Sequence, residues 1–209
     1  MAEWFKAAVL KTAELQGSVG SNPTPSAIAS MERSLKTLHT PRLRMEPLEE
    51  SHAGALFEGL RHEALYEFIS ERAPESVEAL RERYRRLATR ESADGCQSWL
   101  NWALWSLPAD CYVGFVQATV HRDHSADIAY VLFHDAWGHG YAREAVAALI
   151  LHLREDWDAR HVRASVDTRN RRSIALLETL GFRRGAVRAQ AERIHGVLSD
   201  EVEYRLGAD

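Results

Sequence analysis

The chain has little of what marks several protein classes. Its 209 residues include only two cysteines, Cys96 and Cys111, which follow neither disulfide nor metal-ligand spacing. It contains no apolar run near the roughly 18 residues that a membrane-spanning helix needs, and no secretory signal peptide. The formal net charge of −4 argues against a general nucleic-acid surface. We therefore expect a cytoplasmic globular protein without a nucleic-acid or membrane partner, and 45% hydrophobic residues suffice for one sizeable domain.

Residues 1–30 differ in composition from the rest of the chain. Residues 1–12 could form a short amphipathic or targeting helix, but Glu3 and Glu14 argue against an import sequence. Residues 17–30 are rich in Gly, Ser, Pro and Asn, as linkers are. This segment therefore does not belong to the folded domain.

The same segment is consistent with a translated transfer-RNA gene. Gly20–Pro23 back-translates to GGT TCG AAT CCC, which looks like a T-arm. Met1–Trp4 and Val9–Thr12 back-translate to the D-arm and the anticodon arm of a serine tRNA gene. We interpret this segment as a non-native extension before a natural start at Met31, with a disordered native tail as the alternative, and residues 31–209 as the domain.

A strand, a glycine turn and a helix are predicted in the middle of the chain. Asp127–Phe133 is an apolar run rich in β-formers, and Gly138 and Gly140 allow the backbone to bend after it. A helix from Tyr141 follows, because apolar residues recur at helical spacing: Ala142, Val146, Leu149, Ile150 and Leu153. Such a turn directs backbone N–H groups and the positive end of the helix dipole to one point, which suits a phosphate group.

Two common phosphate-binding motifs do not fit this turn. The loop of nucleoside triphosphatases needs Lys and Ser/Thr where the chain has Tyr141 and Ala142, and the G-x-G-x-x-G fingerprint breaks at Arg143. Instead, Trp137–Ala142 resembles the acetyl-CoA motif of the GNAT N-acetyltransferases, (Q/R/W)-x-x-G-x-(G/A). The sequence from Tyr130 to Ala145 is most similar to that of the RimJ/RimL-type branch, which acetylates N-termini of ribosomal proteins.

Two other segments support the resemblance. Val166–Phe182 is similar to N-x-x-S-(I/x)-x-x-(L/Y)-E-x-L-G-F of the same branch, and Thr40–Leu48 is similar to its opening T-x-R-L-x-(L/M)-x-P-L. The resemblance implies an α+β GNAT fold. This fold has a central, mostly antiparallel sheet of six to seven strands with a parallel splayed pair, flanked by about four helices.

The residue pattern predicts elements that suit this fold. The expected strands are Thr40–Leu48, Trp99–Leu107, Cys111–His121, Asp127–Phe133, His161–Asp167, Arg183–Arg188 and Glu201–Leu206. The expected helices are Glu50–Leu60, Val77–Leu87 with Ser76 as its cap, the helix from Tyr141, and Asn170–Leu180 ended by Gly181. His121–His124 has no further ligands at metal spacing and is read as a polar hairpin tip, so no metal is expected. Arginines from Arg81 to Arg90 could hold an anionic partner or form a solvated helix face.

The resemblance implies an acetyl-CoA-dependent N-acetyltransferase acting as a monomer or homodimer. The acceptor would be a primary amine, either a protein N-terminal α-amine or a small molecule, which attacks directly within a ternary complex. The absence of a convincing Ser-His-Asp or Cys-His set is consistent with direct attack. A non-catalytic CoA-binding or regulatory domain is the alternative, and a nucleotide-binding module is the third hypothesis.

The resemblance also assigns contacts to acetyl-CoA. Backbone groups of the strand would pair with the pantetheine arm, the glycine turn would bind the pyrophosphate, and an asparagine would fix the arm. The residues expected there are Tyr130, Val131, Leu132, Trp137, Gly138, His139, Gly140, Tyr141, Ala142, Arg143 and Asn170. Some have a structural interpretation as well: Trp137 as a packed tryptophan, Arg143 as a solvent-facing residue, and Asn170 as a helix N-cap.

The catalytic assignments are less direct. Many GNAT enzymes place a tyrosine general acid seven residues after the motif asparagine, where this chain has Leu177. Ser173 matches the serine that RimL-like enzymes place near the thiolate, with a helix-surface serine as the alternative and Tyr204 as the next donor. Ser173 lies one turn before Leu177 on the same helical face, so both positions are expected to point toward the same part of the cavity. Glu192 resembles a family glutamate that relays the amine proton through water, and Asp167 is the second candidate base. The acceptor itself is not encoded in any readable motif.

Overall fold

The computed structural model describes residues 35–207, so the predicted extension over residues 1–30 lies outside the described part. The strands are β1 Leu38–His39, β2 Leu43–Pro47, β3 Gln97–Ser106, β4 Cys111–His121, β5 Ser125–Leu132, β6 His161–Asp167, β7 Arg183–Ile194 and β8 Val197–Leu206. The α-helices are α2 Ala53–Phe57, α3 Val77–Leu87, α4 Tyr141–Trp157 and α5 Arg171–Thr179. Short 3₁₀ helices are η1 Glu50–His52, η2 Gly59–Arg61, η3 Glu63–Tyr66 and η4 His134–Ala136.

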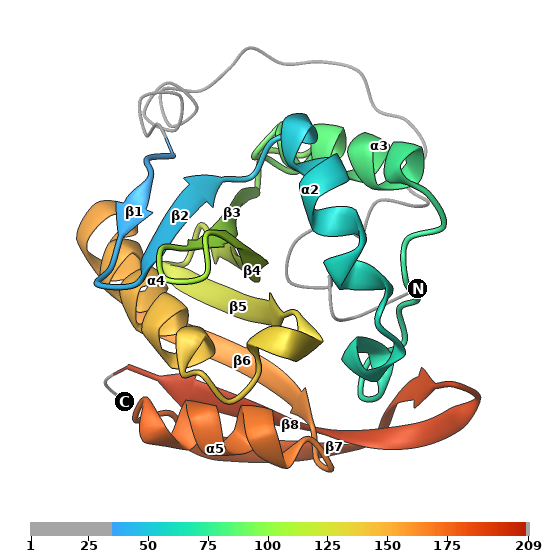
Figure 1. Cartoon of the computed structure of the whole chain (residues 1–209). Coiled ribbons are helices and arrows are strands. Elements are labelled where there is room, and N and C mark those ends of the chain that lie inside the picture. The colour runs from blue at the N-terminus through green and yellow to red at the C-terminus, as the bar shows by residue number, and fades with distance from the viewer. Residues whose placement is uncertain (1–34, 208–209) are drawn as a thin grey trace.

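Within residues 35–207 the strands form one eight-stranded sheet, in the order β1-β2-β3-β4-β5-β6-β8-β7 (Figure 1). Every neighbouring pair is antiparallel except β5 and β6, which are parallel because α4 carries the chain back between them. The predicted mixed, mostly antiparallel α+β fold is therefore confirmed. The sheet has one strand more than the upper expected number, because the two-residue β1 adds an edge strand.

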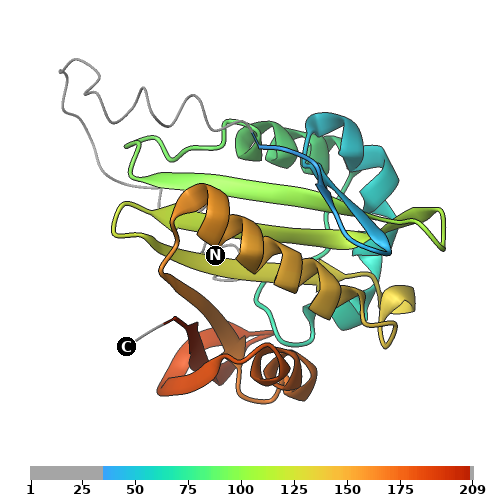
Figure 2. The same cartoon turned by 90° about the vertical axis from the view of Figure 1, so that its left-hand side faces the viewer.

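The helices divide between the two faces of the sheet. In Figure 2, α4 lies in front of β3, β4 and β5, and its apolar side joins the main core, to which Leu177 of α5 also belongs. On the other face α2 and α3 pack on a second cluster that includes Ala103, Phe115 and Val131 from β3, β4 and β5. Among the described residues, β6, β8 and β7 contribute no member to this second cluster. Their second face is therefore available to form a polar surface.

The parallel strands stay together for only three residue pairs. Ser125, Ala126 and Asp127 of β5 lie opposite His161, Val162 and Arg163 of β6, and the two strands then separate. β4 continues to pair with β5 up to Leu132, so β5 remains straight while its β6 side opens. The gap between the strands has the form that the family resemblance predicted, and two of the cavities of the protein border it.

The helix expected at Glu50–Leu60 is wrong as a single element. The chain forms η1, α2 and η2 instead, three short pieces. Glycine weakens a continuous helix, and Gly59 is required for packing, because an added Cβ would lie 2.4 Å from the ring of Phe133. The sequence pattern shows the apolar spacing of this segment but not the aromatic ring that presses against it.

The last two strands are longer than expected. β7 extends to Ile194 and β8 begins at Val197, joined by a hairpin turn in which His195 and Gly196 both have positive φ. Most of β7 is exposed and its register with β8 shifts twice, so it lacks the in-out alternation by which strands are predicted. Glu192 consequently lies on a strand.

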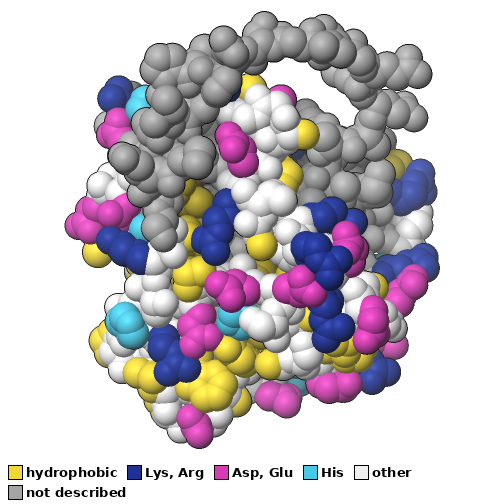
Figure 3. Space-filling view, turned by 90° about the horizontal axis from the view of Figure 1, so that it is seen from above, with side chains coloured by type: hydrophobic (Ala, Val, Ile, Leu, Met, Phe, Trp, Pro, Cys, Tyr) yellow, Lys and Arg dark blue, Asp and Glu magenta, His cyan; other side chains and the backbone are white. Residues whose placement is uncertain are grey.

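The arginines of α3 form an ion-paired face. Arg81 and Arg85 contact Glu50, and Arg83 donates to both oxygens of Glu71. Figure 3, seen from the α3 side, shows basic and acidic side chains intermingled. The solvated-face interpretation thus fits better than an anion-binding surface. Across residues 35–207, no helix has the length and apolar character needed to cross a bilayer.

Candidate active site

A groove of about 730 Å³ lies between the end of β5, the glycine turn, the start of α4 and the first turns of α5. We call it the loop groove and define it by Tyr130, Leu132, Gly138, Arg143 and Ser173. Ten of the eleven residues expected at the cofactor line it. The exception is His139, whose ring is exposed and bonded to the carbonyl oxygen of Trp137 at 2.9 Å.

The glycine turn presents free backbone donors to this groove. Gly138 and Gly140 both have φ of 78°, a conformation that other residues rarely adopt. Gly140 is the N-cap of α4 without a side-chain cap, and the first helical bond runs from Glu144 N to Gly140 O at 3.2 Å. The N–H groups of the first turn therefore remain available to an anion. A Cβ added to Gly138 would meet no atom within 4 Å, so the turn is open on that side.

Arg42 holds the turn in place, a role that the sequence analysis missed. Its Nη1 donates to the carbonyl oxygen of His139 at 2.9 Å, and its Nε donates to Glu144 at 2.7 Å. Glu144 also accepts from Thr40 Oγ1 and from the backbone N–H of Arg42. Thr40, Arg42 and Glu144 all lie within the segments that carry the family resemblance, but their spacing alone does not show that they meet.

Trp137 connects the turn to the strand before it. Its Nε1 donates to the carbonyl oxygen of Leu132 at 2.8 Å, and the guanidinium of Arg172 lies 4.5 Å above the ring. The tryptophan is half-buried and lines the loop groove, so it has both the structural and the groove-lining role considered for it. Arg143 is exposed at the same mouth and makes no ion pair within the described residues.

A second cavity of about 480 Å³ lies on the polar face of β5, β6, β8 and β7. We call it the sheet cavity and define it by Asp127, Ser165, Asp167, Glu192 and Glu203. Its walls combine strands that are far apart in sequence, together with residues of the loop that follows η3. Its lining is more polar than that of the loop groove, which suits a hydrophilic ligand.

The two cavities meet. Both are lined by Phe68, Ile69, Tyr130, Asn170 and Ser173. Asn170 is the N-cap of α5, since its side chain accepts from the backbone N–H of Ser173 at 3.1 Å, as its structural interpretation predicted. Ser173 is half-buried, and its hydroxyl makes no hydrogen bond within residues 35–207. A free donor thus stands where the loop groove joins the sheet cavity.

The side chain of Tyr130 is a second donor at this junction. Its hydroxyl lies 3.5 Å from the carbonyl oxygen of Ser173. Burial raises the pKa of Tyr130 to about 12, so the phenol stays protonated at neutral pH. The sequence analysis gave Tyr130 a backbone role only, because nothing in a strand pattern shows which helix end its side chain reaches.

Two expectations about proton donors are corrected. Leu177 was expected on the Ser173 side of α5 and toward the same cavity, but it is fully buried in the main core and lines neither cavity. Tyr204 is also buried, lines neither cavity and donates to Glu178 at 2.9 Å. Tyr204 is therefore excluded as the next donor after Ser173.

The two candidate bases differ in their partners. Asp167 accepts from the backbone and side chain of Arg169 and from Ser199. Burial alone would raise the pKa of Asp167, but these hydrogen bonds hold it below its ordinary value. Glu192 accepts from Ser70 Oγ and lines the sheet cavity. Asp167 is thus held by a guanidinium and a hydroxyl group, and both carboxylates line the sheet cavity.

The His121–His124 segment closes the β4–β5 hairpin. His121 Nε2 lies 2.7 Å from Asp127, and His124 Nδ1 lies 3.1 Å from Asp158. Each histidine is therefore engaged with a different carboxylate. The described residues contain no group of three or more His, Cys, Asp or Glu side chains that could hold a metal ion.

Comparison with known proteins agrees with this geometry. Residues 42–183, about two thirds of the chain, match the acetyltransferase (GNAT) domain family. The uncharacterized N-acetyltransferase p20 of Bacillus licheniformis is 33% identical over 81 residues, which cover 39% of this chain and 46% of that protein, less than half its length.

Solved structures extend the likeness to the fold. A putative acetyltransferase from T. thermophilus is 29% identical, with a TM-score of 0.66, covering 82% of this chain and 88% of that one. RimL, the ribosomal L7/L12 α-N-protein acetyltransferase in complex with coenzyme A, is 20% identical, with a TM-score of 0.72, covering 81% and 96%. At that identity, the likeness to RimL establishes the fold alone.

Proposed function

The chain belongs to the acetyltransferase (GNAT) domain family, and from this premise we propose that it transfers the acetyl group of acetyl-CoA to a primary amine. The observation that carries the proposal is the junction of two cavities at Tyr130, Asn170 and Ser173. One cavity is available for each substrate. Direct transfer within a ternary complex then needs no acetyl-enzyme intermediate.

The loop groove fits acetyl-CoA. The free N–H groups after Gly140 and the unpaired guanidinium of Arg143 would hold the pyrophosphate, and the open edge of β5 at Tyr130 and Leu132 would pair with the pantetheine arm. RimL, with the same fold, was solved with coenzyme A. When bound, acetyl-CoA supplies the acetyl group as a reactive thioester.

We assign to Ser173 the stabilisation of the negative charge that develops on the leaving thiolate of coenzyme A. Ser173 lines both cavities and its hydroxyl has no competing acceptor among the described residues, so it is free to donate. A hydrogen bond that strengthens as charge develops lowers the barrier rather than the ground state. Tyr130 supplies a second protonated hydroxyl at the same place, bonded to the Ser173 carbonyl in the resting structure.

Glu192 is the residue that we assign to proton removal. A primary amine arrives largely as an ammonium ion at neutral pH and must lose a proton before it can attack. Glu192 lies in the sheet cavity, on the acceptor side of the junction, and relays the proton through water. Asp167 is not assigned this role, since Arg169 already holds both of its oxygens.

Turnover separates this proposal from its alternatives. Release of coenzyme A is measured with a panel of N-terminal peptides, polyamines, amino acids and aminoglycosides. We expect acceptor-dependent release with at least one class. Cofactor binding without turnover across the panel supports the non-catalytic domain, and a larger thermal shift with NAD or ATP than with coenzyme A supports the nucleotide-binding module.

A further inference from the structure

The sheet cavity is lined predominantly by acidic groups. Six carboxylates line it: Asp127, Asp167, Glu192, Asp200, Glu201 and Glu203. Two arginines line it, Arg163 and Arg188. The carboxylates outnumber the arginines by more than the single negative charge that would balance one bound ammonium ion.

The ion pairs around the cavity are asymmetric. In three of them the carboxylate is more buried than the guanidinium, although Arg188 also lines the cavity. The exposed fractions of the side chains are 2% and 50% for Asp167 and Arg169, 11% and 57% for Glu201 and Arg188, and 27% and 68% for Glu203 and Arg205. Water and salt screen the exposed guanidinium ions more strongly than the buried carboxylates. The interior therefore keeps a negative potential although the carboxylates of these three pairs each have a basic partner.

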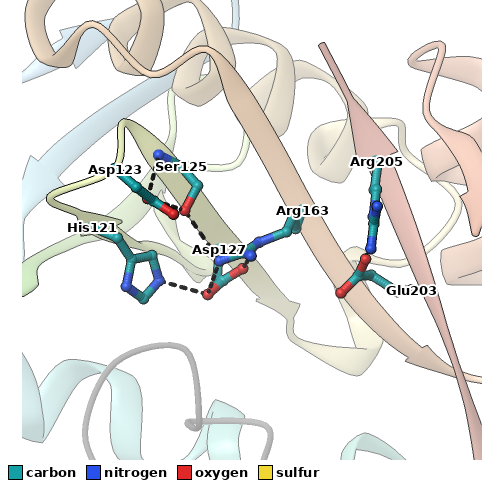
Figure 4. Close-up of polar contacts among 7 residues, drawn as sticks. All are labelled: His121, Asp123, Ser125, Asp127, Arg163, Glu203 and Arg205. Carbon is teal, nitrogen blue, oxygen red and sulfur yellow. Dashed lines mark hydrogen bonds and ion pairs between the residues drawn. The ribbon is translucent and has the colours of Figure 1, made fainter. Parts of the chain in front are cut away.

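A fourth ion pair provides a contrast at the far end of the cavity. Asp127 and Arg163 are exposed to 30% and 32%, and His121 shares the same carboxylate. Figure 4 shows this group on β4–β6 beside the Glu203–Arg205 pair of β8, in agreement with the register of Arg163 opposite Arg205. Asp127 and Arg163 are equally exposed, so the charges of this pair cancel and add little to the negative potential of the cavity. From this end toward the junction, the next carboxylate in the cavity is that of Glu203.

Glu203 lies midway along the floor of the cavity. It is opposite Ser165, while Glu201 is opposite Asp167 at the junction end of β6. Two residues of a strand span about 7 Å, so Glu203 lies roughly that far beyond the junction end. A single small amine at the junction would not reach it.

We propose that the acceptor carries a second positive charge, which binds at Glu203 with support from Glu201. The inference rests on the proposed function and names its substrate class. The shared chemistry is a cationic group joined to the primary amine by a chain of roughly 7–10 Å, the length of two to three extended residues. It can come from a diamine or polyamine, or from a peptide with Lys or Arg near its N-terminus.

The test compares acceptors that differ in the second charge alone. The first pair is 1,6-diaminohexane and hexylamine, and the second is the amidated peptides Ala-Ala-Lys and Ala-Ala-Ala. We expect kcat/KM to be about three- to tenfold higher for the dicationic member of at least one pair, and the preference to shrink as salt is added. Whichever pair shows the preference identifies the source of the charge.

Two variants test the position. Glu203→Gln should remove the preference, whereas Arg205→Gln should increase it by freeing Glu203 from its ion pair. Glu155→Gln removes an exposed acid of α4 and is the control, in which the preference should be unchanged. Equal kcat/KM within both pairs, or an unchanged preference in Glu203→Gln, overturns the inference while acetylation of the monoamine keeps the proposed function. Absence of acetylation with every amine overturns the proposed function instead.

Discussion

The loop groove and the sheet cavity meet at the same residues but are built differently. The groove is made largely from two stretches, residues 130–143 and 170–176, and it offers backbone N–H groups at a glycine turn. The cavity takes side chains from β5, β6, β7, β8 and the loop after η3. One site depends on the course of the backbone, and the other depends on the identity of side chains.

This difference separates what is common to the fold from what is specific to the chain. A site formed by main-chain donors accepts the same ligand whatever side chains surround it, provided that the backbone can take its conformation. A site formed by side chains can change its ligand by single substitutions without changing the fold. We therefore expect the groove to bind the shared cosubstrate and the cavity to determine the acceptor.

The largest effect should come from Gly140→Val, which perturbs the main-chain donors of the loop groove. The substitution places a β-branched residue at φ of 78°, and the strain should move the N–H groups of the turn. Each lost charge-assisted hydrogen bond costs about 1.5–3 kcal/mol, so coenzyme A affinity should fall at least about 100-fold by calorimetry.

A matched control separates strain from ligand binding. Gly196 in the β7–β8 turn has φ of 84°, and a Cβ added there would meet no atom within 4 Å. Gly196→Val should therefore cost similar stability but leave coenzyme A affinity unchanged. If both variants bind coenzyme A equally well, the glycine turn is not the phosphate site.

Ser173→Ala tests the junction itself. The proposed hydrogen bond strengthens in the transition state, so kcat should fall about 10- to 1,000-fold while coenzyme A affinity changes little. Ser51→Ala, a like substitution at an exposed position that lines neither cavity, should leave kcat near the wild-type value. A wild-type kcat in Ser173→Ala would transfer the role to Tyr130, and Tyr130→Phe is then the decisive variant.

The same contrast explains what could be predicted from sequence. The glycine turn, α4 and α5 follow from local periodicity, glycine positions and a contiguous motif, and the structure has all of them. The parallel strand pair follows from the order strand, helix, strand, since a crossover helix joins parallel strands. Asn170 was expected as an N-cap because capping is local, and its side chain does accept from Ser173 N. Features that depend on residues within about fifteen positions of one another, or a few helical turns, can therefore be predicted from the sequence.

The features that escaped prediction are contacts between distant segments. Arg42 reaches His139 and Glu144 across about a hundred residues, and Tyr130 reaches Ser173 across forty-three. The orientation of Leu177 into the core also depends on what α5 packs against, not on its helical phase relative to Ser173. These roles depend on side-chain direction in the assembled fold, which the periodicity of the sequence does not show.

The stability of the domain should also respond to pH through Glu71, which lies outside both cavities. Burial raises the pKa of Glu71 to about 7, against the opposing effect of Arg83, from an ordinary value of 4.5. The folded protein thus keeps a proton that the unfolded chain loses in this range, so the contribution of Glu71 to stability is highest below about pH 4.5, falls as the pH rises toward 7 and levels off above that. At roughly 1.4 kcal/mol per pKa unit, the loss is about 3 kcal/mol in urea unfolding.

Glu71→Gln should flatten that slope between pH 5 and pH 8. Glu78→Gln, at an exposed position at the start of α3, should leave it unchanged. Coenzyme A affinity should not follow the slope, because Glu71 lines neither the loop groove nor its glycine turn. An identical slope in wild type and Glu71→Gln would show that the carboxyl does not titrate in this range.

The smallest effect should come from removing residues 1–30. Every residue assigned to either cavity lies after residue 60, and this segment differs in composition from the domain. A chain that begins at Met31 should keep its melting temperature within about 2 °C and its coenzyme A affinity.

A chain that begins at Thr40 is the contrasting control, because it also loses β1, the buried Leu35, and the carbonyl oxygen of Lys36 that accepts from Trp102 Nε1 at 3.0 Å. Its melting temperature should fall by several degrees, since each kcal/mol is worth about 2–4 °C at this size. If the Met31 chain falls as far as the Thr40 chain, residues 1–30 pack on the domain and the transfer-RNA interpretation loses its support.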